Sequence, residues 1–269
     1  FSYNFLGFSG KFILTRDRKV VLQGQDNLKV NFAHDGSSFT ISDDQGSQFY
    51  FKDKEYVQSA LGTGYPQVSS WLLSRIITQQ KDTITFTYTS DGTSTFVKGV
   101  ISETVRTGGC ADGSFVNNDA GQNYTNLTLQ KIDFSGGQVQ FSFDGNRSDL
   151  QNGKKLNQVK VYAKSSSGNL TYVKEHQLFY SYFDLNPGIS SVDFLRLRLD
   201  SVREASAGIT LPPYVFHYTL PQNYQNLTSK RGYSVDHWGF FNAKGNSGFA
   251  PAWNGMSMKT GYNSPSSYM

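Results

Sequence analysis

The chain has 269 residues, and its 25 Lys and Arg against 21 Asp and Glu give a formal net charge of +4. Aromatic residues make up 15% and charged residues 17% of it, a strand-and-turn composition that excludes a helical bundle, a coiled coil and a disordered chain. The small charge argues against a nucleic-acid binder, and no apolar run reaches the length of a membrane-spanning helix. The single cysteine, Cys110, excludes an intramolecular disulfide.

Two polar turns near the start of the chain predict two consecutive hairpins. Apolar and polar residues alternate on both sides of each turn, so each hairpin should place one face on a core. In the second turn Gly46 follows two aspartates and a glutamine and supplies the positive φ that a hairpin needs. The hairpins are expected to join residues 5–12 to 20–22 and residues 39–41 to 49–51.

The next stretch, residues 54–70, lacks a clean period. Gly62, Gly64 and Pro66 predict a loop there. Residues 68–76 fit both a short helical face and a strand, and the strand is favoured by the repeat that follows them.

A loose internal repeat occupies the middle of the chain. Its template is a leucine and an Ile or Val three residues apart, then a variable turn region and two aromatics that flank one residue. Each copy predicts a hairpin whose second strand projects both aromatics from one face, and these residues are expected to form the core. The four copies are Leu73/Ile76 with Phe86/Tyr88, Leu129/Ile132 with Phe141/Phe143, Leu156/Val159 with Tyr180/Tyr182, and Leu199/Val202 with Phe216/Tyr218.

The last part of the chain differs from the rest. Residues 195–200 alternate leucine with charged residues, which predicts a half-buried strand with a charged outer face. The pattern then stops at Gly239, and the remainder is rich in Gly, Asn and Ser. We therefore expect a single all-β domain at 1–242 and an irregular C-terminal segment at 243–269.

A search for catalytic and metal-binding motifs returns none that fixes a chemistry. His34, His176, His217 and His237 are scattered, and none pairs with another at ligand spacing. The sequence Asp-His-Trp-Gly at 236–239 fits a structural corner better than a catalytic pair, because neighbouring strand residues point to opposite faces. We therefore expect no catalytic residue, no metal and no cofactor, and a protein that is not an enzyme.

Two other motifs leave alternatives open. Residues 117–121 resemble half of a calcium loop but lack the glutamate that closes one. A pair of carboxylates for glycoside chemistry depends on their separation in space, so a glycan-acting enzyme is the third interpretation of this chain. Aromatic rings can stack on sugars, and the candidate residues for a carbohydrate site are Trp71, Trp238 and Trp253.

The order of several short motifs resembles one known family. In chain order the motifs are residues 1–12, 26–30, 39–46, 71–76, 129–132, 196–202, 211–218 and 236–242. This succession is similar to the region upstream of the repeats in RHS/YD-repeat cell-surface proteins of gut-type Gram-negative bacteria. The resemblance implies an exported β-only shell of successive hairpins, which in relatives winds into a hollow spiral around a toxin or other cargo.

Two departures limit what the resemblance carries over. The Tyr-Asp tandem repeats are not in this sequence, and neither is the self-cleaving aspartyl segment that ends such shells, so no catalytic residue is transferred. Phe1 begins inside a strand-like pattern, and we expect a targeting signal, if there is one, to lie upstream.

These observations lead to one main prediction and one alternative. The fold is expected to be all-β, with consecutive antiparallel hairpins in a large curved or spiral, RHS-like sheet. The function is expected to be that of a structural segment of an exported or cell-surface protein, a shell or scaffold whose partners are other regions of the same polypeptide. The alternative is an extracellular carbohydrate-binding module whose partner is a glycan.

Overall fold

The computed structural model describes residues 1–24, 27–59, 64–98, 120–145, 147–150, 152–184 and 192–219. These residues form strands and turns only, and none of them belongs to an apolar helix of membrane-spanning length. The strands are β1 (Ser2–Phe5), β2 (Phe8–Leu14), β3 (Val20–Gln23), β4 (Lys29–Phe32), β5 (Phe39–Ser42), β6 (Gln48–Ser59), β7 (Gln67–Ile77), β8 (Thr83–Lys98), β9 (Ala120–Phe134), β10 (Gly137–Asp144), β11 (Lys155–Lys164), β12 (Leu170–Asp184), β13 (Leu195–Ser206), β14 (Ile209–Thr210) and β15 (Tyr214–Val215).

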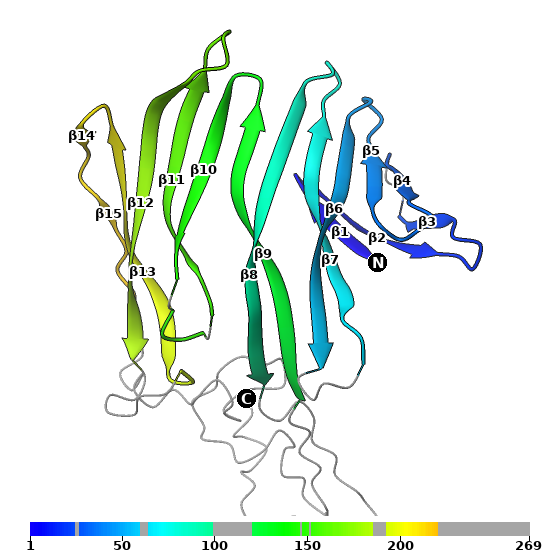
Figure 1. Ribbon diagram of the computed structural model, residues 1–269, viewed down its shortest axis with the longest axis horizontal. Helices are drawn as coiled ribbons and strands as arrows, with labels where there is room; N and C mark the ends of the chain where they lie inside the picture. The colour runs from blue at the N-terminus through cyan, green and yellow to red at the C-terminus, as the bar shows by residue number, and fades with distance from the viewer. Residues whose placement is uncertain are drawn as a thin grey trace, which may run out of the picture.

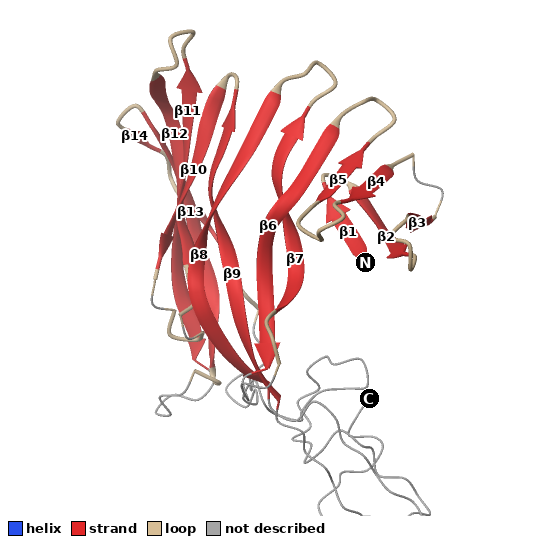
Figure 2. Ribbon diagram, turned by 45° about the vertical axis from the view of Figure 1, so that its right-hand side comes forward, coloured by secondary structure: helices blue, strands red, loops and turns tan. Residues whose placement is uncertain are grey.

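The strands form two sheets, and neighbours in sequence are neighbours in space (Figures 1 and 2). A small sheet has the order β1-β2-β3, and a large sheet of twelve strands runs from β4 to β14, with β15 also paired to β13. Every pairing is antiparallel. The predicted all-β class of consecutive antiparallel hairpins in a large sheet is therefore confirmed.

Both predicted N-terminal hairpins are present, and the first contains an additional one. The second forms as β5 and β6, and Gly46 has the expected positive φ of 89°. The stretch predicted as one strand at 5–12 is interrupted by a two-residue turn, in which Leu6 and Gly7 have φ of 45° and 88°. Positive φ at both central residues is the signature of a type I′ turn, so β1 folds back on β2 before β2 pairs with β3.

The loop predicted at 54–70 is wrong over most of its length. β6 continues to Ser59 and β7 begins at Gln67, and the two strands pair as far as Val57 with Gln67. The pairing of β6 with β7 contains three register shifts. Each shift changes which residues face the same side, so the sequence here shows no regular alternation of apolar and polar residues although the strands continue. The strand favoured at 68–76 is confirmed.

The repeat copies form hairpins as predicted, except that the last is short. The first three copies form the hairpins β7–β8, β9–β10 and β11–β12. In the fourth copy only Tyr214 and Val215 pair with β13, and Phe216 and Tyr218 are 44% and 45% exposed. The expectation that these two aromatics lie in the core is wrong, because no strand covers them in the described part of the chain.

The buried apolar core lies at the N-terminal end of the molecule. It is formed where the small sheet packs on β4 to β7, and it combines Tyr3, Phe5 and Phe12 with residues of the large sheet. The buried residues of the large sheet, together with Leu28 just before β4, are Leu28, Val30, Phe39, Ile41, Phe49 and Ile76. Of the residues predicted to form the core, Ile76 is buried, and Leu73 and Phe86 pack against the cluster. The remaining predicted core residues lie elsewhere in the sheet.

Candidate functional site: an open apolar sheet face and an aromatic cavity

One face of the large sheet is apolar from β4 to β13. Directly paired residues of neighbouring strands project to the same side, so the registers define this face. Its central row runs across four strands as Phe86, Ile132, Val139 and Val161. We call it the apolar face, and beyond the core it includes Ile84, Phe86, Ile132, Val139, Phe141, Val159, Val161, Leu178, Tyr180, Tyr182, Leu197, Leu199 and Val202.

The small sheet covers only one end of the apolar face. Phe5 lies against Phe49 with 4.9 Å between ring centroids, and Phe12 lies 5.4 Å from Phe39, so β1 and β2 sit over β5 and β6. Among the residues that the structure describes, no apolar side chain after Ile76 is buried. The apolar face of β9 to β13 is thus half-buried and has no second layer from the described part of the chain, whereas Ile84 and Phe86 of β8 pack against the core.

A charged group interrupts the apolar face near its far end. Val159 pairs with His176, which pairs with Glu204, so all three project to the same side. The Glu204 carboxylate lies 3.6 Å from His176 Nδ1 and 3.3 Å from Lys174 Nζ. One ammonium group and one imidazole ring therefore flank this carboxylate.

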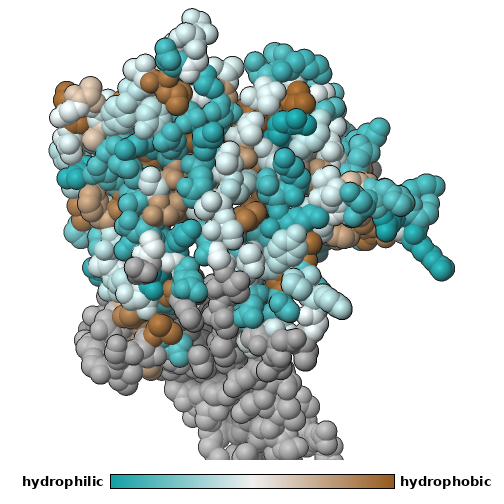
Figure 3. Space-filling view, in the orientation of Figure 1, coloured by the Kyte–Doolittle hydropathy of each residue, from teal (hydrophilic) through white to brown (hydrophobic). Residues whose placement is uncertain are grey.

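The opposite face of the large sheet is polar, and aromatic rings on it carry arginines. Arg75 lies 4.2 Å from the ring centroid of Tyr50, Arg203 lies 5.0 Å from Phe179, and Arg198 lies 5.1 Å from Phe183. Figure 3 shows a side of the molecule on which hydrophilic residues predominate and hydrophobic residues occur in small separate groups. The half-buried strand predicted at 195–200 is confirmed in β13, in which the leucines and the charged residues are alike half-buried.

Ion pairs tie the polar face together. Lys164 Nζ lies 2.6 Å from Asp133, and Gln138 donates to the same carboxylate at 2.7 Å. These hydrogen bonds, with the charges of Lys164 and Lys131, hold the pKa of Asp133 below its usual value. Side chains of neighbouring strands therefore pair with one another on this face, in contrast to the apolar face.

A clasp fixes the loop between β10 and β11 to strands further along the sheet. Arg147 donates two hydrogen bonds to Asp149, at 2.9 Å and 2.8 Å, and the Asp149 side chain is only 5% exposed. The Leu197 main chain also donates to Asp149, and the Tyr182 hydroxyl accepts from the main chain of Ser148. Pairing with Asp149 raises the pKa of Arg147, so the clasp stays charged.

A polar cluster fills the place where β7 and β8 separate. These strands pair only at Arg75–Ile77, and the lower end of β9 pairs with β6 instead. Glu55 accepts from the Leu127 main chain at 3.1 Å and from the Ser70 hydroxyl at 2.6 Å, which joins three strands. Tyr88 donates to the Leu73 carbonyl at 2.8 Å, and burial, together with Asp53 and Glu55, raises its pKa to about 12.

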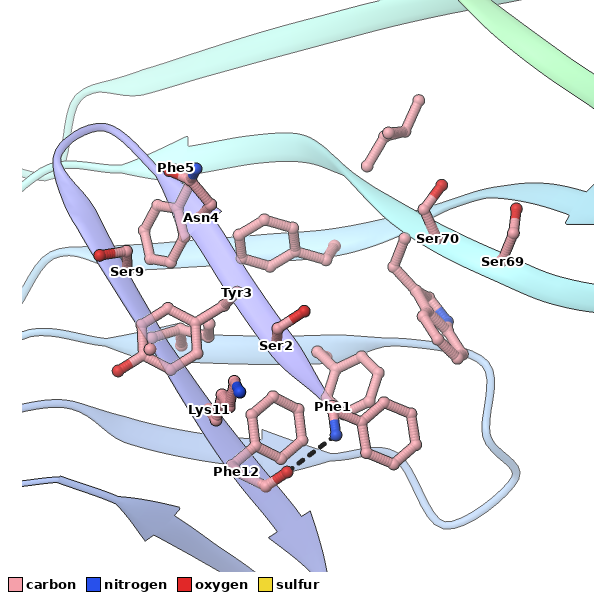
Figure 4. Close-up of a pocket in the computed structure, with 16 residues that line it drawn as sticks. Phe1, Ser2, Tyr3, Asn4, Phe5, Ser9, Lys11, Phe12, Ser69 and Ser70 are labelled. Carbon is pink, nitrogen blue, oxygen red and sulfur yellow. Dashed lines mark hydrogen bonds between the residues drawn. The ribbon is translucent and has the colours of Figure 1, made fainter. Parts of the chain in front are cut away.

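A cavity of about 820 Å³ lies between the small sheet and the large one (Figure 4). Seven of its sixteen lining residues are aromatic, among them Phe1, Tyr3, Phe39, Phe51 and Trp71. Serines and an asparagine of β1, β2 and β7 supply hydroxyl and amide groups at its rim, and Lys11 is the one charged residue in the lining. The size and character are those of a ligand pocket.

Only one of the three tryptophans predicted for a carbohydrate site can be placed. Trp71 lines the cavity, where its ring meets Phe39 edge to face with 4.9 Å between centroids. Its buried Nε1 has no hydrogen-bond partner in the described part of the chain. Trp238 and Trp253 lie outside the described residues, as do Cys110, the motif at 236–239 and the segment 243–269, so these predictions stay predictions.

Some of the residues considered for metal or histidine chemistry can be placed in the structure. In the described ranges no three His, Cys, Asp or Glu side chains are grouped so as to hold a metal ion. Asp43 belongs to a hairpin turn, in which its Oδ1 accepts from the main chains of Gln45 and Ser47. His34 is exposed in a turn and His217 is exposed after β15. Residues 117–119 of the half calcium loop at 117–121 lie outside the described residues, and Ala120 and Gly121 begin β9.

Sequence reasoning missed β1 as a separate strand at the rim of the cavity. Phe1 and Phe12 exchange two main-chain hydrogen bonds, at 2.9 Å and 3.0 Å (Figure 4). The burial of β1 alternates, with Ser2 and Asn4 exposed and Tyr3 and Phe5 buried. The sequence does contain a signal for this turn, Leu6-Gly7, because a glycine between two stretches of alternating apolar and polar residues can mark a two-residue hairpin turn.

The chain matches no protein-family model and no curated protein. It is similar to part of the Photorhabdus luminescens Tc holotoxin pore (13% identity, 67% of this chain and 10% of that chain, TM-score 0.40). It is also similar to the N-terminal domain of the effector protein SpvB from Salmonella typhimurium strain LT2 (13% identity, 77% and 73%, TM-score 0.39) and to TcdB2-TccC3 (13%, 65% and 10%, TM-score 0.36). The chain spans about a tenth of the Tc structures. Similarity at this level defines neither a family nor a function.

Proposed function

We propose that this chain is a non-catalytic scaffold segment of an exported or cell-surface, RHS-like protein, and that an adjoining region of the same polypeptide covers its apolar face. The observation that carries the proposal is the continuous apolar row of Ile132, Val139 and Val161, which the described residues leave without a second layer. An apolar sheet face is stabilised by burial against another element, so a large uncovered one indicates an interaction surface.

The polar face and the clasp support the same proposal. Cross-strand ion pairs and arginine–aromatic contacts occupy the polar face, and charged residues are suited to contact with water, so the apolar side is the one that favours a cover. The order of motifs that resembles the RHS family is the reason for proposing an extracellular or outer-surface location. The proposal also includes a shell-like curvature of the sheet and a cargo that such a shell would enclose.

The test is hydroxyl-radical footprinting of the native gene product and of this chain alone, with labelling read at single residues. Phe141 and Tyr180 report on the apolar face, and Phe179 and Phe183 on the polar face are the matched controls. We expect the first pair to be labelled several-fold less in the native gene product, and the controls to change little. Equal changes on both faces would contradict the proposal, because the apolar face would then have no dedicated cover.

A further inference from the structure

Among the described residues, no strand pairs with the outer edge of β1, which lies beside the aromatic cavity. Phe1 and Phe12 form a hydrogen-bonded pair, and such pairs alternate along an antiparallel ladder, so Tyr3 and Phe5 also bond to β2. The N–H and C=O groups of Ser2 and Asn4 therefore point away from β2. In the described part of the chain β1 pairs with β2 alone.

Apart from its short length of four residues, this edge carries, in the described part of the chain, none of the usual protection against another strand. Natural edge strands are blunted by a charged side chain, a proline, a bulge or a covering element. β1 reads Ser-Tyr-Asn-Phe, and its ladder with β2 has no register shift. In the described part of the chain, the main-chain N–H and C=O groups of Ser2 and Asn4 are therefore available for pairing with another strand.

The cavity lies along the same edge. Figure 4 shows Ser2 and Asn4 on β1 and Ser69 and Ser70 on β7, and all four line the cavity together with Trp71. A strand added beside β1 would place every second side chain over the aromatic lining and the others in solvent. Among the described residues no carboxylate lines the cavity, and the buried Nε1 of Trp71, a lining residue, has no hydrogen-bond partner there.

We infer that β1 and this cavity form a strand-addition site for an extended peptide segment of a partner polypeptide, with alternating apolar side chains. Main-chain hydrogen bonds to Ser2 and Asn4 would supply affinity, and the aromatic cavity would select the apolar side chains, as in other cases of strand addition. The edge favours a peptide over a glycan, since a strand pairs with both free main-chain positions at once. The inference does not depend on the scaffold function proposed above.

The test uses a proline at the free edge. Asn4→Pro removes an N–H that points away from β2, so the β1–β2 ladder keeps its hydrogen bonds, and proline is tolerated at such edge positions. Asn4→Ala removes the same side chain but keeps the N–H and is the matched control. Ser2→Pro and Ser2→Ala form a second pair in case one proline prevents folding, which circular dichroism checks.

The probe is a fluorescein-labelled octapeptide that alternates valine and threonine between terminal lysines, titrated by fluorescence anisotropy. We expect saturable binding to the unchanged chain and to Asn4→Ala, and binding weaker by about tenfold or more in Asn4→Pro, because a main-chain hydrogen bond is lost and the ring obstructs the edge. Trp71→Ala should weaken binding as well.

Three outcomes overturn the inference. The first is the absence of saturable peptide binding to the unchanged chain. The second is equal affinity of folded Asn4→Pro and Asn4→Ala for the peptide. The third is binding on a glycan array that Trp71→Ala abolishes and Asn4→Pro leaves intact, without peptide binding, which would assign the cavity to carbohydrate.

Discussion

Phe5 and Phe49 lie with 4.9 Å between their ring centroids, and this contact joins the two sheets of the protein. Phe5 belongs to β1 of the small sheet and is 9% exposed, and Phe49 belongs to β6 of the large sheet and is 5% exposed. The contact lies in the buried core, so the packing of the two sheets depends on it.

Phe49→Ala should therefore be strongly destabilising. Removing a buried phenylalanine costs about 3–5 kcal/mol of unfolding free energy, because the transfer energy is lost and a cavity remains. The control is Phe216→Ala, at a position that is 44% exposed, for which we expect a loss below about 1 kcal/mol. Urea denaturation measures both, and similar losses at the two positions would place the core elsewhere.

Ser74→Ala tests the register shift beyond which β6 and β7 remain paired. Ser74 is buried, and its Oγ accepts from the main chains of Lys52 and Asp53 at 3.1 Å and 3.3 Å. The alanine leaves two amides unsatisfied, and we expect a loss of about 1–3 kcal/mol together with faster hydrogen exchange at Lys52 and Asp53. Ser69→Ala, at an exposed position of β7, should change little. Unaltered exchange at the two amides would contradict this role.

The hairpins were predictable because their signals are local. Gly46 after two aspartates, and paired aromatics that flank one residue, fix a turn and a strand face without knowledge of distant residues. Core positions depend instead on which strands the small sheet covers. Phe216 and Phe86 occupy equivalent places in the repeat, but only Phe86 packs against the core.

The candidate site was less predictable than the fold. The sequence indicates Trp71 as a possible sugar platform, but its cavity exists only because β1 crosses above β5 to β7. β1 in turn depends on the Leu6-Gly7 turn, which a longer apolar pattern concealed. Nothing in the local sequence predicts that Glu55 accepts from the main chain of Leu127, 72 positions away.

Arg147→Ala tests the clasp. The variant leaves the Asp149 carboxylate, 5% exposed, without its cation, and breaking a buried pair from one side is more costly than removing both partners. We expect Arg147→Ala to lower the free energy of unfolding by about 2–4 kcal/mol. This is at the lower end of the range for buried ion pairs, because the Arg147 side chain is 23% exposed. In Arg147→Met combined with Asp149→Leu, most of the stability should return.

The exposed ion pair of Lys19 and Asp17 provides the contrast for that prediction. Its side chains are 81% and 59% exposed, so Lys19→Ala should leave the unfolding midpoint in urea unchanged. If Arg147→Ala and Lys19→Ala had the same effect, the clasp would have no special role in holding the loop against β13.

Tyr88→Phe should change how stability depends on pH above neutrality. Burial, Asp53 and Glu55 raise the pKa of Tyr88 from 10.0 to about 12, so between these values the unfolded chain loses a proton that the folded chain keeps. Unfolding is favoured by that loss, and this contribution to stability, fully present below pH 10, disappears as pH rises to about 12. Urea denaturation at steps from pH 9 to 12 should show a shallower decline in Tyr88→Phe than in the unchanged chain. Tyr65→Phe, at a position that is 91% exposed, controls for the loss of one tyrosine, and a decline equal in all three proteins would contradict the buried, proton-retaining state of Tyr88.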